Sequence, residues 1–495
     1  MRFNNKLTKP SNEMSDEFKL YLLACSDALM GGRLESEKDN IVNLVKGVAP
    51  EYTARLAAYS RRELNNRAAG TLLTAALVRH HGGMWARLAV YNVVQRADEF
   101  GELIAAVDGL SRTRLRSDGV FKKPKLSLPS SLKRGLADVF ESGRFDEYQY
   151  SKWNKRSAGV KIEDALRLVH PEPQNHKQTE LFKKIANKQL EKAETHERKI
   201  GKIRTEVKDE KEKNELEKQT WRDLLQQKKL SHIALIRECK HILQTDSSLV
   251  GLYCEELWRT GESSNTLPHA YISMLREVLS GIFPVSLEQP VTATTQQLMR
   301  HRAGRVASKF GKRLVICIDT SLSMDCTLNS RSKISRLDSA LTLGCSLLST
   351  GEHRGIVFSE GAKFVPPISE DLFMGINATG NLVQRGMTNF FAATELIKRL
   401  DPDNFDAVLV LTDMAFNYEL NNLEKKLARN VHGKSVYLVD LAGSLRSPIE
   451  FKNGCYFLAG LSEASLGLLD KLRQGNSMID EIMKFNLLKP ARKGE

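Results

Sequence analysis

The sequence has few cysteines and no pattern that would organise them. Seven cysteines are scattered over 495 residues, and none is spaced C-x-x-C, so neither a disulfide framework nor a zinc site is indicated. The N-terminal residues contain no apolar signal core, and no stretch reaches the ~20 apolar residues that a membrane span needs. We therefore expect a cytoplasmic protein.

The common signatures of nucleotide-binding and hydrolytic enzymes are also missing. No G-x-G-x-x-G follows a predicted strand, and "HGKS" at 432–435 lacks the earlier glycine of a phosphate-binding loop, because Ala428 stands there. Asp319 is not followed two residues later by the second acid that a phosphoaspartate hydrolase requires. Neither H-E-x-x-H nor G-x-S-x-G occurs. We predict that the protein is not an enzyme.

The chain does have an excess of positive charge. Its formal net charge is +14 at pH 7, which suits a polyanionic partner such as nucleic acid, or an anionic membrane surface. A soluble protein with a merely basic surface is the alternative. The hydrophobic fraction of 41% is ordinary for a globular protein, and the length predicts two or more domains.

Residues 15–305 have a helical pattern. Stretches such as "NIVNLVKGV" and "TLLTAALVRH" carry apolar residues at i, i+3, i+4 spacing, which predicts an α-solenoid of HEAT-like helical hairpins. The mixed-sign charge run at 178–230 is interpreted as a solvated helix or helical pair, with a phosphate-contacting arm as the alternative. In the next helix we expect Ile233, Ile236 and Leu243 to share one packed face.

After residue 310 the pattern changes to α/β. Apolar runs at "RLVICID", "RGIVFS", "AVLVLTD", "SVYLVDL" and "CYFLAGL" predict strands, and helical patterns lie around 335–349, 389–400, 419–429 and 463–474. Strands that are apolar throughout and alternate with helices indicate a doubly wound, mostly parallel sheet covered on both faces. We predict a helical domain over 1–309 and an α/β domain over 310–495, joined by a basic linker.

Two predicted strand ends and the start of one predicted helix carry oxygen-bearing side chains. Asp319, Ser321 and Ser323 follow the first strand, Asp413 ends another, and Thr388 precedes a helix. Side chains at the carboxyl ends of parallel strands converge, and two carboxylates with three hydroxyls suit Mg²⁺ or Mn²⁺ better than zinc. We expect the hydroxyls to bind directly and the acids partly through water, which leaves a position for a partner's carboxylate. A capping role without metal is the alternative. The set is similar to the metal-ion-dependent adhesion site of von Willebrand factor type A domains.

Basic residues cluster in the helical half. The first group is Arg112, Arg114, Arg116, Lys122, Lys123, Lys133 and Arg134. In the second, Tyr148, Tyr150 and Trp153 stand among Lys152, Lys155 and Arg156. Basic residues hold phosphates and aromatic rings stack unpaired bases, so this pattern favours single-stranded RNA. A solvated basic face with Trp153 as a core anchor is the alternative, and His170 by default ends a helix.

The stretches "SLKRGLADVF", "YSKWNKR", "DALRLVHPEP" and "HIALIREC", in this order before a type A domain, resemble the TROVE-domain proteins of the Ro autoantigen family. This resemblance implies a ring of HEAT-like hairpins closed by the type A domain. It implies a monomer that binds small Y-like RNAs on its basic outer surface and single-stranded ends of misfolded RNAs in its hole. It further implies a ribonucleoprotein in RNA quality control without catalysis of its own, working beside an exoribonuclease.

The resemblance also assigns RNA contacts to Lys152, Lys155, Arg156 and His170, and metal binding to the five oxygen-bearing residues. A protein-interaction adaptor remains the competing interpretation. In it, the metal site recruits an acidic partner and the basic solenoid binds no RNA. Magnesium dependence separates the two, because RNA binding by the solenoid should survive removal of the metal.

Overall fold

The computed structural model describes residues 15–26, 38–112, 128–153, 160–191, 194–264, 266–310, 313–328, 334–368, 370–415, 430–442, 455–459 and 478–490. Two compact units are present. One comprises Glu13–Thr195 with Asn476–Glu495, and the other is built on His196–Gly475. Each unit is treated below by itself.

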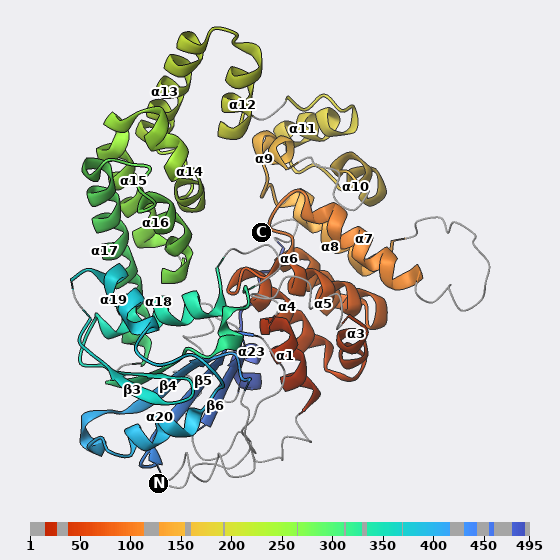
Figure 1. Ribbon diagram of the computed structural model, residues 1–495. Helices are drawn as coiled ribbons and strands as arrows, with labels where there is room; N and C mark the ends of the chain where they lie inside the picture. Colours follow the sequence, from red (N-terminus) through yellow and green to blue (C-terminus); the bar gives the residue numbers. More distant parts are fainter. Residues whose placement is uncertain are drawn as a thin grey trace. The chain divides into compact units, whose positions relative to one another are not determined.

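The first unit is helical and consists of stacked hairpins (Figure 1). Its helices are α1 (Asp16–Ser26), α3 (Lys38–Gly47), α4 (Pro50–Arg62), α5 (Arg67–His80), α6 (Gly83–Val93), α7 (Glu99–Arg112), α8 (Ser130–Glu141), α9 (Glu147–Lys152), α10 (Ile162–Val169), α11 (His176–Ala186) and α23 (Met478–Lys484). Helix α4 packs against α5 and α6, α5 also packs against α7, and α6 against α8. Contacts between helices one and two positions apart are those of a helical-repeat stack, as predicted.

An aromatic cluster forms the centre of this unit's core. Phe140 of α8 packs against Phe100 of α7, Tyr150 of α9 and Phe182 of α11, with ring centroids 4.2, 6.1 and 5.9 Å away. These rings are buried, so their apolar surface is removed from water and fixes how the short helix α9 lies on its neighbours.

The last described segment of the chain also packs in this unit. Asn92 of α6 donates from Nδ2 to the Leu488 carbonyl and accepts at Oδ1 from the Leu488 N–H, both at 2.9 Å. Arg62 of α4 lies over the Phe485 ring, 5.0 Å from its centroid. The C-terminal segment therefore returns to helices that begin more than 380 residues earlier in the chain.

The second unit starts with further helices and ends with the sheet. Its helices are α12 (His196–Glu206), α13 (Glu210–Gln226), α14 (His232–Thr245), α15 (Val250–Ser263), α16 (Ile272–Val278), α17 (Val285–Phe310), α18 (Arg336–Leu348), α19 (Leu372–Gly380) and α20 (Phe390–Ile397). The strands are β1 (Leu314–Asp319), β2 (Arg354–Phe358), β3 (Ala362–Val365), β4 (Ala407–Thr412), β5 (Ser435–Asp440) and β6 (Cys455–Ala459).

The charged run predicted as a solvated helix or helical pair forms α12 and α13, together with most of α11. Arg204 of α12 and Glu217 of α13 form an ion pair at 3.0 Å. Pairs such as Lys213 with Glu210 run along the helix at i, i+3.

One expectation for the next helix was wrong. Ile233 of α14 is 57% exposed, because α14 buries the turn that contains His232 and Leu235 instead.

The sheet has the order β3-β2-β1-β4-β5-β6. All neighbours are parallel except β2 and β3, so the predicted mostly parallel, doubly wound α/β architecture is confirmed. Helix α18 contacts β1, β2 and β4, whereas α20 contacts β2 and β3, and Figure 1 shows them on opposite sides of the sheet. The chain leaves β1 for β2 and later returns to β4 on β1's other side. The switch point, where α/β sheets usually bind ligands, therefore lies at the carboxyl ends of β1 and β4.

Two elements of this unit were not predicted. Strand β3 is an antiparallel edge strand with exposed residues, so its four residues carry no apolar run. Helix α19 contains two glycines, which weaken the helical signal.

The helices expected around 419–429 and 463–474 lie outside the described residues. Among the described helices, none has the length and apolar character needed to cross a membrane.

Candidate functional site

Strand β1 ends in a loop of hydroxyl side chains. Asp319 is its last residue and is fully buried, and its Oδ1 accepts a hydrogen bond from the Ser321 backbone N–H at 2.9 Å. The Oγ atoms of Ser321 and Ser323 lie 3.2 Å apart. A carboxylate that binds the backbone two residues on makes a tight turn, and this turn brings both hydroxyls beside the acid. Three of the predicted ligands, Asp319, Ser321 and Ser323, therefore lie together in one loop.

The end of β4 supplies the second acid. The Thr412 hydroxyl donates to Asp319 Oδ2 at 2.7 Å and accepts from the Met414 N–H at 3.1 Å, so it joins the two strand ends. Met414 has a φ of 61°, which L residues rarely adopt, and this turns the chain directly after Asp413. Asp413 is buried, and its Oδ1 accepts from the Ala415 N–H at 3.1 Å.

A third segment closes over the loop. Arg385 donates from Nε to the Thr320 carbonyl at 3.0 Å, and from Nη2 to the Ser321 carbonyl at 3.2 Å and to Asp325 Oδ1 at 2.7 Å. Thr388, three residues further on, is buried. Arg385 therefore fixes the backbone that carries the predicted serine ligands and positions the segment that carries the predicted threonine.

The electrostatics of this site are those of two buried acids. Burial raises the pKa of Asp319 to about 6; hydrogen bonds from Ser321 and Thr412 oppose this rise, and the charge of Asp413 adds to it. A cation pairs with the second of these acids. Nη1 of Arg336, the first residue of α18, lies 3.1 Å from Asp413 Oδ2.

The chemistry of the donor set fits a hard divalent cation. Carboxylate and hydroxyl oxygens at the switch point suit Mg²⁺ or Mn²⁺, whose charge would also offset that of the two buried acids. Among the described residues, no group of three or more His, Cys, Asp or Glu side chains is placed to hold a metal. A metal here would therefore depend on the hydroxyls of Ser321, Ser323 and Thr388. Metal binding by these residues stays a prediction.

In the helical unit, Lys152 lies among aromatic rings. It is the last residue of α9, and its Nζ is 5.7 Å from the centroid of Tyr148 and 5.2 Å from that of Trp153. Arg96 lies over the same Trp153 ring at 3.5 Å. Tyr148 is 47% exposed, whereas Trp153 is half-buried. Two cations and an exposed ring are thus assembled at the end of α9.

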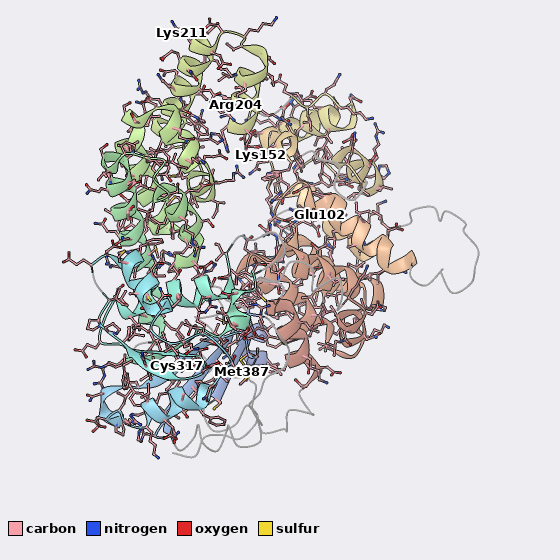
Figure 2. All side chains as sticks on the ribbon, viewed as in Figure 1. Glu102, Lys152, Arg204, Lys211, Cys317 and Met387 are labelled. Carbon is pink, nitrogen blue, oxygen red and sulfur yellow. The ribbon has the colours of Figure 1, made fainter. Side chains whose placement is uncertain are left out.

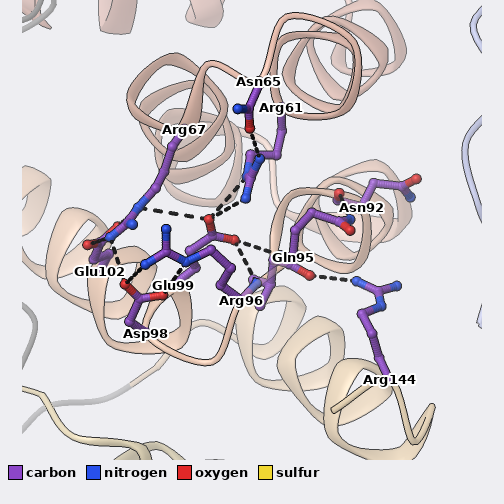
Figure 3. A network of polar contacts seen from close by, with 11 residues as sticks. Arg61, Asn65, Arg67, Asn92, Gln95, Arg96, Asp98, Glu99, Glu102 and Arg144 are labelled. Atoms are coloured by element: carbon purple, nitrogen blue, oxygen red, sulfur yellow. Dashed lines mark hydrogen bonds and ion pairs between the residues drawn. The ribbon is translucent and has the colours of Figure 1, made fainter. Parts of the chain in front are cut away.

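A network of ion pairs holds Arg96 in place (Figure 3). Asp98 accepts two hydrogen bonds from the Arg96 guanidinium, at 3.0 and 2.7 Å. Glu99, which is 2% exposed, accepts from the Arg96 N–H at 3.1 Å and from Arg61 at 3.1 and 2.6 Å. The edge of the Arg96 guanidinium is therefore paired, and its face is against Trp153.

The other predicted RNA contacts are more dispersed. His170 is exposed at the end of α10 with a φ of 53°, and its backbone N–H donates to the Leu166 carbonyl at 2.9 Å, so it does end a helix. Lys133 and Arg134 are exposed in the first turn of α8, whereas α9 packs near the last turn of α8. Tyr150 was expected among the surface aromatics, but it is a core residue with 1% exposure.

Several predicted contacts cannot be placed. Lys155 and Arg156, and Arg114, Arg116, Lys122 and Lys123, lie outside the described residues, as does the side chain of Arg112. Conversely, Arg96 and Arg336 were not predicted. Arg336 meets Asp413, and Arg96 meets Trp153, through tertiary packing, so no local motif indicates either contact.

The comparisons with known proteins agree with this architecture. Residues 34–247 match the family model of the TROVE domain. The crystal structure of the Deinococcus radiodurans Ro (RSR) protein is similar, with a TM-score of 0.58 and 15% identity over 88% of this chain and 93% of that one. At this identity the similarity concerns the fold. No curated protein sequence matches the chain. Residues 34–247 therefore match a TROVE domain, and the fold of the chain is similar to that of the Ro protein.

Proposed function

We propose that this protein binds RNA through its TROVE domain. The observation that carries the proposal is Lys152 beside the rings of Tyr148 and Trp153, inside the matched residues; Arg96, which is itself paired with Asp98, packs on the Trp153 ring. Cations next to aromatic rings bind phosphate and base together, and Tyr148 is exposed enough to stack on an unpaired base. The net charge of +14 supports a polyanionic partner.

The finer function follows the family resemblance. The RNAs are small, structured and Y-like, together with single-stranded ends of misfolded RNAs in the hole of a closed ring. The role is non-catalytic, in RNA stability, maturation or quality control, beside an exoribonuclease. We further propose that the protein acts as a cytoplasmic monomer.

The first test is RNA crosslinking to the protein purified from its native cells at moderate salt. Recovery of a few abundant small RNAs with a stem formed by their ends would support Y-like RNA as the ligand. Enrichment no better than that of a basic control protein would contradict RNA binding.

The second test measures the salt dependence of binding to a single-stranded RNA. Each phosphate contact contributes about 0.7 to the slope of log K against log salt. Lys152→Ala should weaken binding and reduce the slope by about that amount, and adding Lys155→Ala and Arg156→Ala should reduce it further. Lys46→Ala removes the same charge from α3 and should leave the slope unchanged. A slope that Lys152→Ala does not change would refute this placement.

His170 requires its own test, because its exposed position at a helix end is also what a purely structural residue would show. His170→Ser should weaken binding of structured RNA while the helix end stays formed. Unchanged affinity in a folded variant would remove His170 from the interface.

We propose, as a second and compatible function, that the strand ends form the adhesion site of a type A domain. A Mg²⁺ or Mn²⁺ ion on Asp319, Ser321, Ser323, Thr388 and Asp413 would bind a partner's carboxylate. Leu322 and Met387 are each adjacent in sequence to predicted ligands and are 58% and 54% exposed, so an apolar group beside that carboxylate would fit. Met387 is labelled in Figure 2. EDTA or Asp319→Ala should release the protein partner and leave RNA bound. Loss of RNA under both treatments would contradict two separate sites.

A further inference from the structure

The metal site contains a cation of the protein's own. Nη1 of Arg336 lies 3.1 Å from Asp413 Oδ2, and the two residues are 77 positions apart in the sequence. The Asp413 side chain is 1% exposed, so the ion pair is shielded from water on the acid's side. A guanidinium at this distance from a predicted metal ligand competes with a divalent cation for the negative charge of the same carboxylate.

Apart from this pair, two features make the placement of Arg336 unfavourable. Its Nε is buried and has no hydrogen-bond partner among the described residues, which leaves a desolvated donor unpaired. It is also the first residue of α18, where the helix dipole is positive and a cation is disfavoured. The charge of Asp413 is the contact that holds the guanidinium there.

The backbone of Arg336 is fixed, so only its side chain can move. Ser335 caps α18, with the Asp338 N–H donating to Ser335 Oγ at 3.0 Å, and the Arg336 N–H donates to the Cys326 carbonyl at 2.9 Å. The Arg336 side chain is 17% exposed, which gives it a short route to solvent. Leaving Asp413 would also hydrate the unpaired Nε.

We propose that Arg336 is the resident counter-ion of the metal site, and that its guanidinium must release Asp413 before a divalent cation binds. The proposal rests on the metal site of the proposed second function. With Arg336 in place, the two acids and the guanidinium sum to one negative charge. An entering dication would be repelled by the guanidinium at short range until the side chain turns outward.

Mn²⁺ binding to the full-length protein, followed by electron paramagnetic resonance of the free ion, tests the proposal. Arg336→Met keeps the length of the side chain without its charge, and it should bind Mn²⁺ at least tenfold more tightly than the wild type. Arg354→Met is the matched control. It removes an exposed arginine at the first residue of β2, at the amino-terminal end of the parallel strands and thus at the other end from the metal site, and should change the affinity less than twofold.

Thermal unfolding gives an independent readout. Without metal, Arg336→Met should melt below the wild type, because Asp413 is left buried without its counter-ion. Mn²⁺ should then raise the melting temperature of this variant more than that of the wild type. Should Arg336→Met not fold, Arg336→Lys, which keeps a charge but loses the fork of donors, should bind Mn²⁺ with intermediate affinity.

The outcomes separate this proposal from the metal site itself. Equal or weaker Mn²⁺ binding by Arg336→Met, with a wild type that binds, would overturn the counter-ion role and leave the site intact. Binding by Arg336→Met alone would support the role strongly. Absence of Mn²⁺ binding in all variants would overturn the metal site, and this proposal with it.

Discussion

Replacing Glu99 with alanine should destabilise the helical unit far more than replacing a surface glutamate. Glu99 is 2% exposed and accepts hydrogen bonds from the Arg61 guanidinium and from two backbone N–H groups, those of Gln95 and Arg96. Arg61 is itself 7% exposed. Removing one partner of a buried ion pair leaves an uncompensated charge and costs about 3–5 kcal/mol. Because 1.4 kcal/mol is a factor of about ten, opening of this region should become at least a hundredfold more frequent.

Amide hydrogen exchange followed by mass spectrometry is the suitable assay, since it reports on α4–α7 separately from the other unit. Glu51→Ala is the control. Glu51 pairs with Arg55 at i, i+4 on α4, where the two side chains are 33% and 20% exposed, and helix pairs of this kind contribute about 0.5 kcal/mol or less. Exchange in α5–α7 that rises no more in Glu99→Ala than in Glu51→Ala would refute the reasoning.

Three further predictions concern the sheet-containing unit. Burial, with the charge of Arg302 adding to it, lowers the pKa of His232 to about 4, so the unfolded chain takes up the proton first on acidification. The free energy of unfolding should therefore fall by on the order of 3 kcal/mol as the pH is lowered from 6.5 to 4. In urea titrations at each pH, His232→Gln should lack this decrease. A Cβ at Gly344 would lie 2.4 Å from Ile318 Cδ1, so Gly344→Ala should cost about 1–3 kcal/mol in the same titrations, with Gly351→Ala, whose Cβ meets only His353 at 3.8 Å, as the control. Arg385→Ala removes three hydrogen bonds from the loop of Ser321 and should weaken Mn²⁺ binding; unchanged affinity would mean that the loop holds its shape alone.

The sequence by itself determined most of the sheet. Strands β1, β2, β4, β5 and β6 were predicted because a parallel strand covered on both faces must be apolar throughout. The same rule located Asp319, Ser321, Ser323 and Asp413, since a strand's carboxyl end can be read from where its apolar run stops, whereas Thr388 was placed from the helix that follows it. Strand β3 was not predicted because an exposed edge strand has no continuous apolar run in its sequence.

The tertiary structure alone decided which charges meet. Arg336 and Asp413 are 77 residues apart, and nothing in either local sequence indicates the other. In the same way, Arg96, which follows α6 in the chain, reaches Trp153 only because α6 packs against α8, to which α9 is anchored through Tyr150 and Phe140. The hydrophobic periodicity of a sequence indicates whether a position faces the core. Ion pairs and cation–aromatic contacts depend on which surfaces the packed elements bring together, and that follows from the fold as a whole.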